Sequence, residues 1–135
     1  MAASFDVTTG TLFGTVGESR TEADFAAHLE QPLRRDPQGE WVIILDQFNT
    51  HKSEGAVRLV DHYCDLQLEL GVKGKAGILK SMARRAQFLE EPTHRIRFIY
   101  TPKHSSWLNQ VEIWFSILVR CVLKRGSFDS SEALR

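Results

Sequence analysis

Two acidic residues lie next to apolar segments, where burial of a carboxylate costs free energy unless the group binds a partner. Asp46 directly follows the apolar run at 41–45, and Glu112 lies at the edge of an apolar helical arc between Trp107 and Trp114. Carboxylate oxygens are hard ligands that suit Mg²⁺ or Mn²⁺, and paired ions can clamp the oxygens of phosphoryl transfer. If the two side chains converge, they predict divalent-metal binding, although such a site normally has three or more carboxylates.

Each of these residues also has a purely structural interpretation. Asp46 suits a turn or a helix cap, and Glu112 suits the rim of a core, bonded to Asn109 or paired with Arg120. For His51 and Asn49, shortly after Asp46, the alternatives are that they orient water, that they contact a scissile nucleic-acid strand, or that they only cap the following helix. The residues alone leave these alternatives open.

The spacing of apolar residues predicts one α/β domain with a mixed sheet. The expected elements are a hairpin at 3–7 and 11–16, a helix capped by Thr21, a strand at 41–46, a helix from Ser53 to about 63, a strand at 66–70, a basic helix at 78–89, a strand ending before Pro102 and a long helix at 105–124. The uninterrupted apolar run in this strand, which ends on Asp46, predicts a central strand covered on both faces. Ligands of open α/β sheets gather beyond the carboxyl ends of strands, where Asp46 falls.

The formal net charge of zero conceals a strong asymmetry along the chain. Residues 1–72 carry five basic and twelve acidic side chains, whereas residues 73–103 carry eight basic and two acidic ones. A basic segment of this kind attracts a polyanion, and its candidate contacts are Lys73, Lys75, Lys80, Arg84 and Arg85. Lys103 and His104 precede the helix of Glu112, whose N-terminus also favours a phosphate. A solvated helix face would explain the same charges.

Cysteine usage and hydropathy indicate a cytoplasmic protein. Cys64 and Cys121 lie far apart among apolar residues, which predicts free thiols in a reducing compartment. No run approaches the roughly 18 apolar residues of a membrane span, and the first residues lack the pattern of a signal peptide.

Three segments together resemble a known family. They are "VIILDQFNTHKSEGAVRLV", "GVKGKAGILKSMARRAQFL" and "RIRFIYTPKHSSWLNQVEIWFSILVRCVLKRGSF". They resemble the DDE transposases of bacterial insertion sequences related to the mariner elements, most specifically in the Trp-Leu-Asn-x-x-Glu-x-x-Trp pattern of the third segment. The resemblance implies a ribonuclease-H-like catalytic domain, a mixed sheet flanked by helices, whose acidic triad binds two Mg²⁺ (or Mn²⁺) ions. It also implies cleavage of DNA at element ends and transfer of the 3′-hydroxyl to target DNA.

By this resemblance, Asp46 corresponds to the second triad aspartate and Glu112 to the terminal glutamate. Asn109 corresponds to the asparagine that precedes that glutamate. The family's fold has three antiparallel strands before its first helix, and the first strand carries the first aspartate. This sequence offers two strands there, and Asp6 in "FDVTTG" suits a turn better than a metal site.

The resemblance therefore predicts a truncated catalytic domain at 1–135 that lacks its first strand and the family's helix-turn-helix, and Met1 is doubtful as the natural start. We expect it to be inactive alone. The expected partners are double-stranded DNA of the element ends and target, at the nucleoid, and either a second copy of the chain or a complementing N-terminal fragment. The alternatives are a non-catalytic DNA-binding remnant of a transposase and another ribonuclease-H-like nuclease.

Overall fold

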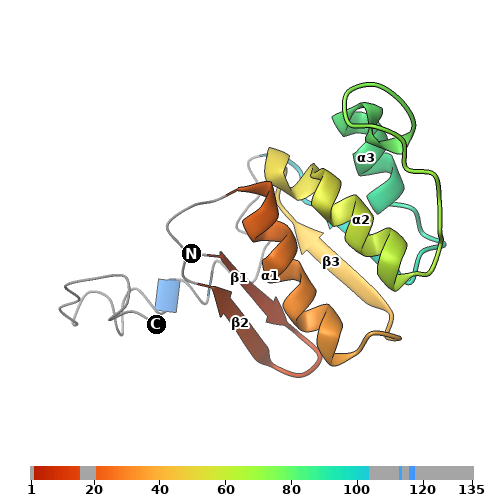
Figure 1. Ribbon diagram of the computed structural model, residues 1–135. Coiled ribbons are helices and arrows are strands. Elements are labelled where there is room, and N and C mark those ends of the chain that lie inside the picture. The colour runs from red at the N-terminus through yellow and green to blue at the C-terminus, as the bar shows by residue number, and fades with distance from the viewer. Residues whose placement is uncertain (1, 16–20, 104–112, 114–115, 118–135) are drawn as a thin grey trace.

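The computed structural model describes residues 2–15, 21–103, 113 and 116–117. The elements in chain order are β1 (Ala2–Asp6), β2 (Thr11–Thr15), α1 (Glu22–Arg35), β3 (Trp41–Leu45), the 3₁₀ turn η1 (Asn49–Lys52), α2 (Glu54–Tyr63), the 3₁₀ turn η2 (Ile78–Lys80), α3 (Met82–Leu89) and β4 (Ile96–Tyr100). This mixed α/β order, shown in Figure 1, agrees with most of the predicted elements. The long helix predicted at 105–124 falls almost entirely outside the described residues.

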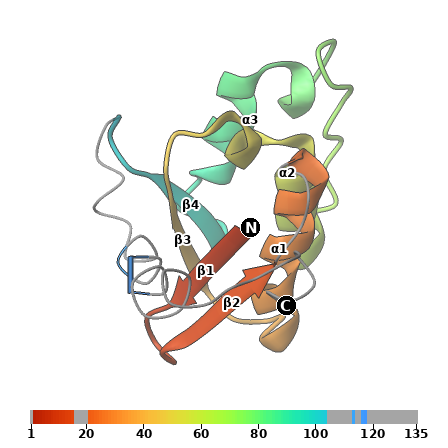
Figure 2. The same ribbon diagram turned by 90° about the vertical axis from the view of Figure 1, so that its left-hand side faces the viewer.

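The described strands form two separate two-stranded sheets. β1 and β2 are antiparallel, whereas β3 and β4 are parallel, with Trp41 opposite Ile96 and Leu45 opposite Tyr100. α1 packs against the hairpin and α2, and Figure 2 shows α1 and α2 together on one side of the strands. Because β3 and β4 are parallel, their carboxyl ends meet at one edge.

The first turn of α1 forms as its sequence predicts. The Thr21 hydroxyl accepts the backbone N–H of Asp24 at 3.2 Å, and the Asp24 carboxylate accepts the backbone N–H of Thr21 at 2.8 Å. This reciprocal pair satisfies N–H groups that a helix N-terminus leaves without partners. Leu29 and Leu33 are buried, as the apolar spacing predicts.

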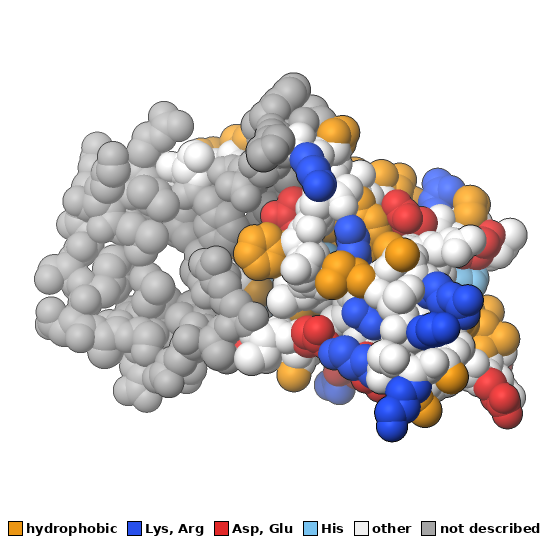
Figure 3. Space-filling view, turned by 90° about the horizontal axis from the view of Figure 1, so that it is seen from above, with side chains coloured by type: hydrophobic (Ala, Val, Ile, Leu, Met, Phe, Trp, Pro, Cys, Tyr) orange, Lys and Arg blue, Asp and Glu red, His pale blue; other side chains and the backbone are white. Residues whose placement is uncertain are grey.

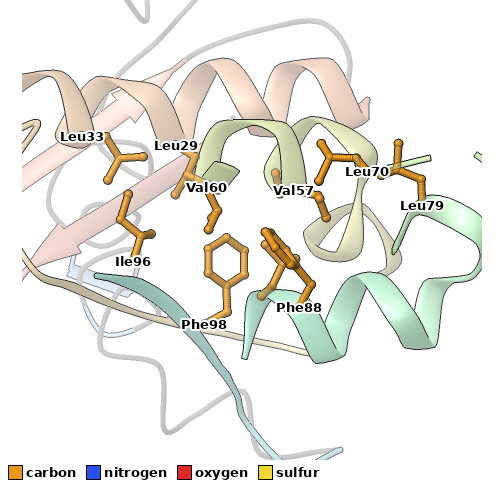
Figure 4. Packing of buried hydrophobic residues seen from close by; sticks show 11 residues of the cluster. Leu29, Leu33, Val57, Val60, Leu70, Leu79, Phe88, Ile96 and Phe98 are labelled. Atoms are coloured by element: carbon orange, nitrogen blue, oxygen red, sulfur yellow. The ribbon is translucent and has the colours of Figure 1, made fainter. Parts of the chain in front are cut away.

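The core lies between the helices and one face of the β3–β4 sheet (Figure 4). Phe98 of β4 is 1% exposed and points toward the buried side chains of α2 and α3. Full burial of a side chain of this kind contributes about 1.5–3 kcal/mol. The core therefore fixes the sheet against its helices.

The other face of the β3–β4 sheet is partly exposed, which differs from the prediction. Val42 is 50% exposed and Ile44 is 52% exposed. The alternating residues Trp41, Ile43 and Leu45 pack against the core. The prediction that the apolar run is covered on both faces is wrong for the described part of the chain. Successive side chains of a strand point to opposite faces, and α1, α2 and α3 pack against one of them.

Two further predictions are wrong in detail. The stretch 66–70 is not a strand, because Asp65 and Gln67 have φ of 53° and 52°, which is incompatible with extended pairing. The predicted helix at 78–89 is divided at Ser81, which has extended backbone and whose hydroxyl caps α3 by accepting the N–H of Arg84 at 3.2 Å. Cys64 is a free thiol, and Cys121 lies outside the described residues.

A buried histidine joins α1 to the hairpin. His28 is 5% exposed, and its ring lies 3.1 Å from the Ser4 hydroxyl through Nε2 and 3.0 Å from the Thr15 hydroxyl through Nδ1. Burial lowers the pKa of His28 from its ordinary value of 6.5, because desolvation disfavours the charged imidazolium.

We expect this histidine to make folding less stable in acid. Below pH 6.5 the unfolded chain binds a proton that the folded His28 resists, so the free energy of unfolding falls as pH drops from 6.5 toward the lowered pKa. Urea unfolding between about pH 7.5 and pH 5 measures this slope. His28→Asn should remove part of it, whereas His62→Gln, at an exposed histidine, should leave it unchanged. An identical slope in all three proteins would contradict the assignment.

Candidate functional site

Asp46 lies at the carboxyl edge of the β3–β4 sheet, as its position after the apolar run predicts. β3 ends at Leu45, whose carbonyl accepts the N–H of Thr101 at 2.7 Å just beyond β4. The Asp46 side chain is 38% exposed. A carboxylate at this edge is accessible to a ligand that approaches the ends of the strands.

The two carboxylate oxygens of Asp46 have different surroundings. Oδ1 accepts the N–H of Phe48 at 3.1 Å and lies 2.8 Å from Nδ1 of His51. Oδ2 has no hydrogen-bond partner among the residues that the structure describes. The turn interpretation and the ligand interpretation of Asp46 are thus compatible, because each uses a different oxygen.

His51 is the neighbour that sequence reasoning left undecided. Ser53, not His51, caps α2, because its hydroxyl accepts the N–H of Ala56 at 3.2 Å. The His51 ring instead packs against Phe25 of α1 with 4.6 Å between ring centroids. The only feature of the sequence that indicates a contact between His51 and Asp46 is their spacing, a histidine five residues after an aspartate that ends a strand. Asn49, its companion in that prediction, is exposed.

Other polar groups hold this edge together. Gln47 donates to the carbonyl of Thr101 at 3.0 Å and accepts from Lys52 at 2.8 Å. The Tyr100 hydroxyl donates to the carbonyl of His51 at 3.1 Å, and the Lys52 ammonium lies 4.9 Å from the Tyr100 ring centroid. Burial, with a smaller contribution from Glu90, raises the pKa of Tyr100 well above its ordinary value, so the phenol stays a donor.

Asp46 suits a metal ion as one hard-oxygen ligand. Among residues 2–15, 21–103, 113 and 116–117, no three His, Cys, Asp or Glu side chains gather as a metal site would require. Glu112 and Asn109, the other predicted site residues, lie outside the described residues. The described part of the chain therefore holds one candidate ligand and the groups that orient it.

Asp6 does not supply a second ligand. Its Oδ1 accepts the N–H of Thr8 at 2.9 Å and its Oδ2 accepts the hydroxyl of Thr9 at 2.6 Å, and these bonds lower its pKa. β1 and β3 point in roughly opposite directions in Figure 1, so Asp6 at the end of β1 faces away from the edge of Asp46. The prediction that Asp6 is a turn residue is confirmed.

Four of the five predicted basic contacts are exposed, namely Lys73, Lys75, Lys80 and Arg84. Lys73 pairs with Glu22 at 2.7 Å, and Arg84 donates to the carbonyl of Gly77 at 3.4 Å. Lys75 and Lys80 have no side-chain partner in the described residues. Lys103 is also exposed, and His104 lies outside the described residues. Figure 3 shows Lys and Arg side chains spread over the described part of the face seen from above, with Asp and Glu side chains among them.

Arg85 differs from these four residues. It is 6% exposed, and it donates to the carbonyl of Lys52 at 2.7 Å and to the carbonyl of Leu79 at 3.0 Å. A guanidinium engaged in this way links α3 to the turn after Asp46 and has little surface for a phosphate. Because this burial conflicts with its predicted DNA contact, we leave Arg85 out of the proposed DNA surface.

Glycines shape the loop that carries the exposed lysines. Gly77 has φ +70°, and a Cβ there would lie 2.6 Å from the carbonyl oxygen of Leu70. Gly71 has φ +86°, and a Cβ there would lie 2.2 Å from the carbonyl oxygen of Ala76. Val72 bridges to Ala76, so the loop is a closed turn that presents Lys73 and its neighbours to solvent.

This loop lies near the carboxyl edge of the sheet. Lys73 reaches Glu22 in the first turn of α1, and Phe25, three residues further on, contacts His51. On the other side, Arg85 of α3 contacts Lys52. The basic loop and the turn after Asp46 are therefore connected through contacts with α1 and α3.

The described residues also form a hollow of about 260 Å³ at the opposite edge of the β3–β4 sheet. Its lining includes Glu40, Trp41, His94 and Arg97. This hollow lies where the strands begin, so it is distinct from the edge that carries Asp46. No helix in the described part of the chain is long and apolar enough to cross a membrane.

The family described as DDE superfamily endonuclease matches residues 1–135, the whole chain. No curated protein and no solved structure matches the chain. The match is consistent with the mixed α/β architecture. The chain therefore belongs to the DDE superfamily endonucleases.

Proposed function

We propose that this chain is the catalytic domain of a transposase from a bacterial insertion sequence related to the mariner elements, working in the cytoplasm at the nucleoid. Its family implies DNA as the substrate, and such nucleases generally depend on divalent metals. The observation that carries the proposal is Asp46, which lies at the carboxyl edge of the sheet and has one carboxylate oxygen without a donor among the described residues.

In this proposal Asp46 and Glu112 hold Mg²⁺ or Mn²⁺, and Asn109 lies beside Glu112. Bound metal would lower the pKa of an attacking water and stabilise charge on the phosphate. The protein's own part is to hold the Asp46 carboxylate at the edge of the sheet and to bring the DNA backbone to it. Lys73, Lys75, Lys80, Arg84, Lys103 and His104 are the proposed backbone contacts.

The two separate sheets support a missing strand. Within the described residues β3 pairs with β4 alone, and Val42 and Ile44 are half-exposed on one face. A strand between β1 and β3 would join the two sheets into one ribonuclease-H-like sheet and pair the edges that have no strand partner among the described residues. We propose that a complementing N-terminal segment supplies this strand, that a second copy of the chain is the alternative partner, and that residues 1–135 form one domain without activity of their own.

A nicking assay tests the proposal. The chain alone is compared with the chain extended by the residues that its gene encodes in frame upstream, using supercoiled DNA that carries the element ends. We expect the extended chain to nick this DNA only with Mg²⁺ or Mn²⁺, and the chain alone to leave it intact. Chelation of the metal should abolish nicking. Robust nicking by the chain alone would show that another carboxylate completes the site.

A second candidate is a non-catalytic DNA-binding remnant of a transposase. It is favoured by the single candidate ligand in the described residues, next to a well-exposed basic loop. It predicts salt-dependent DNA binding by both forms and nicking by neither. Another ribonuclease-H-like nuclease would instead cut RNA or branched DNA without any preference for element ends.

A further inference from the structure

Lys52, the last residue of η1, places an ammonium group at the carboxyl edge of the β3–β4 sheet. The ammonium donates to Oε1 of Gln47 at 2.8 Å and lies 4.9 Å from the centroid of the Tyr100 ring. Gln47 directly follows Asp46, and Tyr100 is the last residue of β4, so both partners belong to this edge. We propose that Lys52 binds a backbone phosphate of DNA there. This inference rests on the proposed function, which supplies DNA as the ligand, and it requires no metal ion.

The charge of Lys52 has no carboxylate partner within the described residues. No ion pair there includes Lys52, and Asp46, the carboxylate at this edge, lies against His51 instead. Lys52 is partly buried, and removing an ammonium from water costs free energy unless acceptors or an anion replace its hydration. An ammonium has three N–H groups, of which Gln47 accepts one. The others remain for the face of the Tyr100 ring and for an anionic ligand.

Lys52 is held at both its backbone and its side chain. Its carbonyl accepts Nε of the buried Arg85 at 2.7 Å. Gln47 is itself fixed, because its Nε2 donates to the carbonyl of Thr101 at 3.0 Å. The hydroxyl of Tyr100 donates to the carbonyl of the residue before Lys52 at 3.1 Å. An ammonium held in this way loses less conformational entropy on binding a phosphate than the solvent-exposed lysines of the basic loop do.

The test compares variants of the chain that keep or remove one charge. Lys52→Arg keeps the charge, and Lys52→Met removes it while leaving an unbranched side chain against the Tyr100 ring. Arg34→Gln, at an exposed arginine in the last turn of α1, is the control for net charge. Fluorescence anisotropy with labelled duplex DNA across a salt series gives affinities and slopes, and urea unfolding checks each fold. Independently, NMR follows the ¹⁵Nζ signals of the wild-type lysines, with that of Lys52 assigned by its absence from Lys52→Arg.

We expect Lys52→Met to weaken DNA binding about tenfold at ~0.1 M salt and to reduce the slope of log affinity against log salt concentration by about 0.9, as for one phosphate contact. Lys52→Arg and Arg34→Gln should keep the wild-type slope, and the Nζ signal of Lys52 should shift when DNA is added. A wild-type slope in folded Lys52→Met would overturn this contact alone. If Lys52→Met does not fold, the NMR measurement on the wild-type chain decides, and an unshifted Nζ signal at saturating DNA overturns the contact. If the wild-type chain binds no DNA, the proposed function fails as well.

Discussion

Asp46→Asn in the extended chain is expected to reduce metal-dependent nicking by about three orders of magnitude, or roughly 4 kcal/mol in the activation barrier. The substitution keeps the size of the side chain but removes its negative charge. Because the N–H of Phe48 donates to Oδ1, the amide oxygen of Asn should take that place. The amide NH₂ would then face the metal, where it has no lone pair to offer.

The matched control is Asp6→Asn. Asp6 is an equally conservative target, but its carboxylate serves a turn at the far end of β1, and Asn supports the same turn. Asp6→Asn should therefore leave nicking unchanged, while Glu112→Gln should resemble Asp46→Asn. Wild-type nicking by a protein that carries both Asp46→Asn and Glu112→Gln would refute the metal site.

The second large effect concerns DNA affinity. Replacing Lys75, Lys80 and Arg84 together by Gln should weaken binding to duplex DNA by roughly two to three orders of magnitude at ~0.1 M salt. Each lost phosphate contact removes about 0.9 from the slope of log affinity against log salt concentration. Lys75 and Lys80 extend into solvent without a side-chain partner in the described residues, so their removal should leave the fold intact.

Arg34→Gln with Arg35→Gln provides the control for net charge. These residues form the last turn of α1, at the opposite end of that helix from the Glu22–Lys73 pair. Fluorescence anisotropy with labelled duplex across a salt series measures both slopes, which are then compared per charge removed. Equal slopes per charge would mean that DNA responds to total charge, and the basic loop would lose its proposed role.

Local sequence determined much of the fold because the interactions involved are local. Thr21 and Asp24 cap α1 through each other, and Ser53 caps α2, with partners within three residues. The Asp6 turn forms within "FDVTT" in the same way. Apolar spacing likewise predicted which side of α1 is buried. The failure at 66–70 is also local, since alternation predicted a strand where Asp65 and Gln67 have left-handed backbone.

Contacts between distant segments decided the rest. By itself the sequence determined that Asp46 ends an apolar strand and that a basic segment follows, because hydrophobic period and charge are properties of neighbours along the chain. Only the tertiary structure decided that Arg85 is buried against Lys52, and that Val42 and Ile44 are half-exposed, since burial depends on what packs from elsewhere. The position of His51 beside Asp46 has the same origin, because Phe25 and Tyr100, which contact His51, belong to other elements.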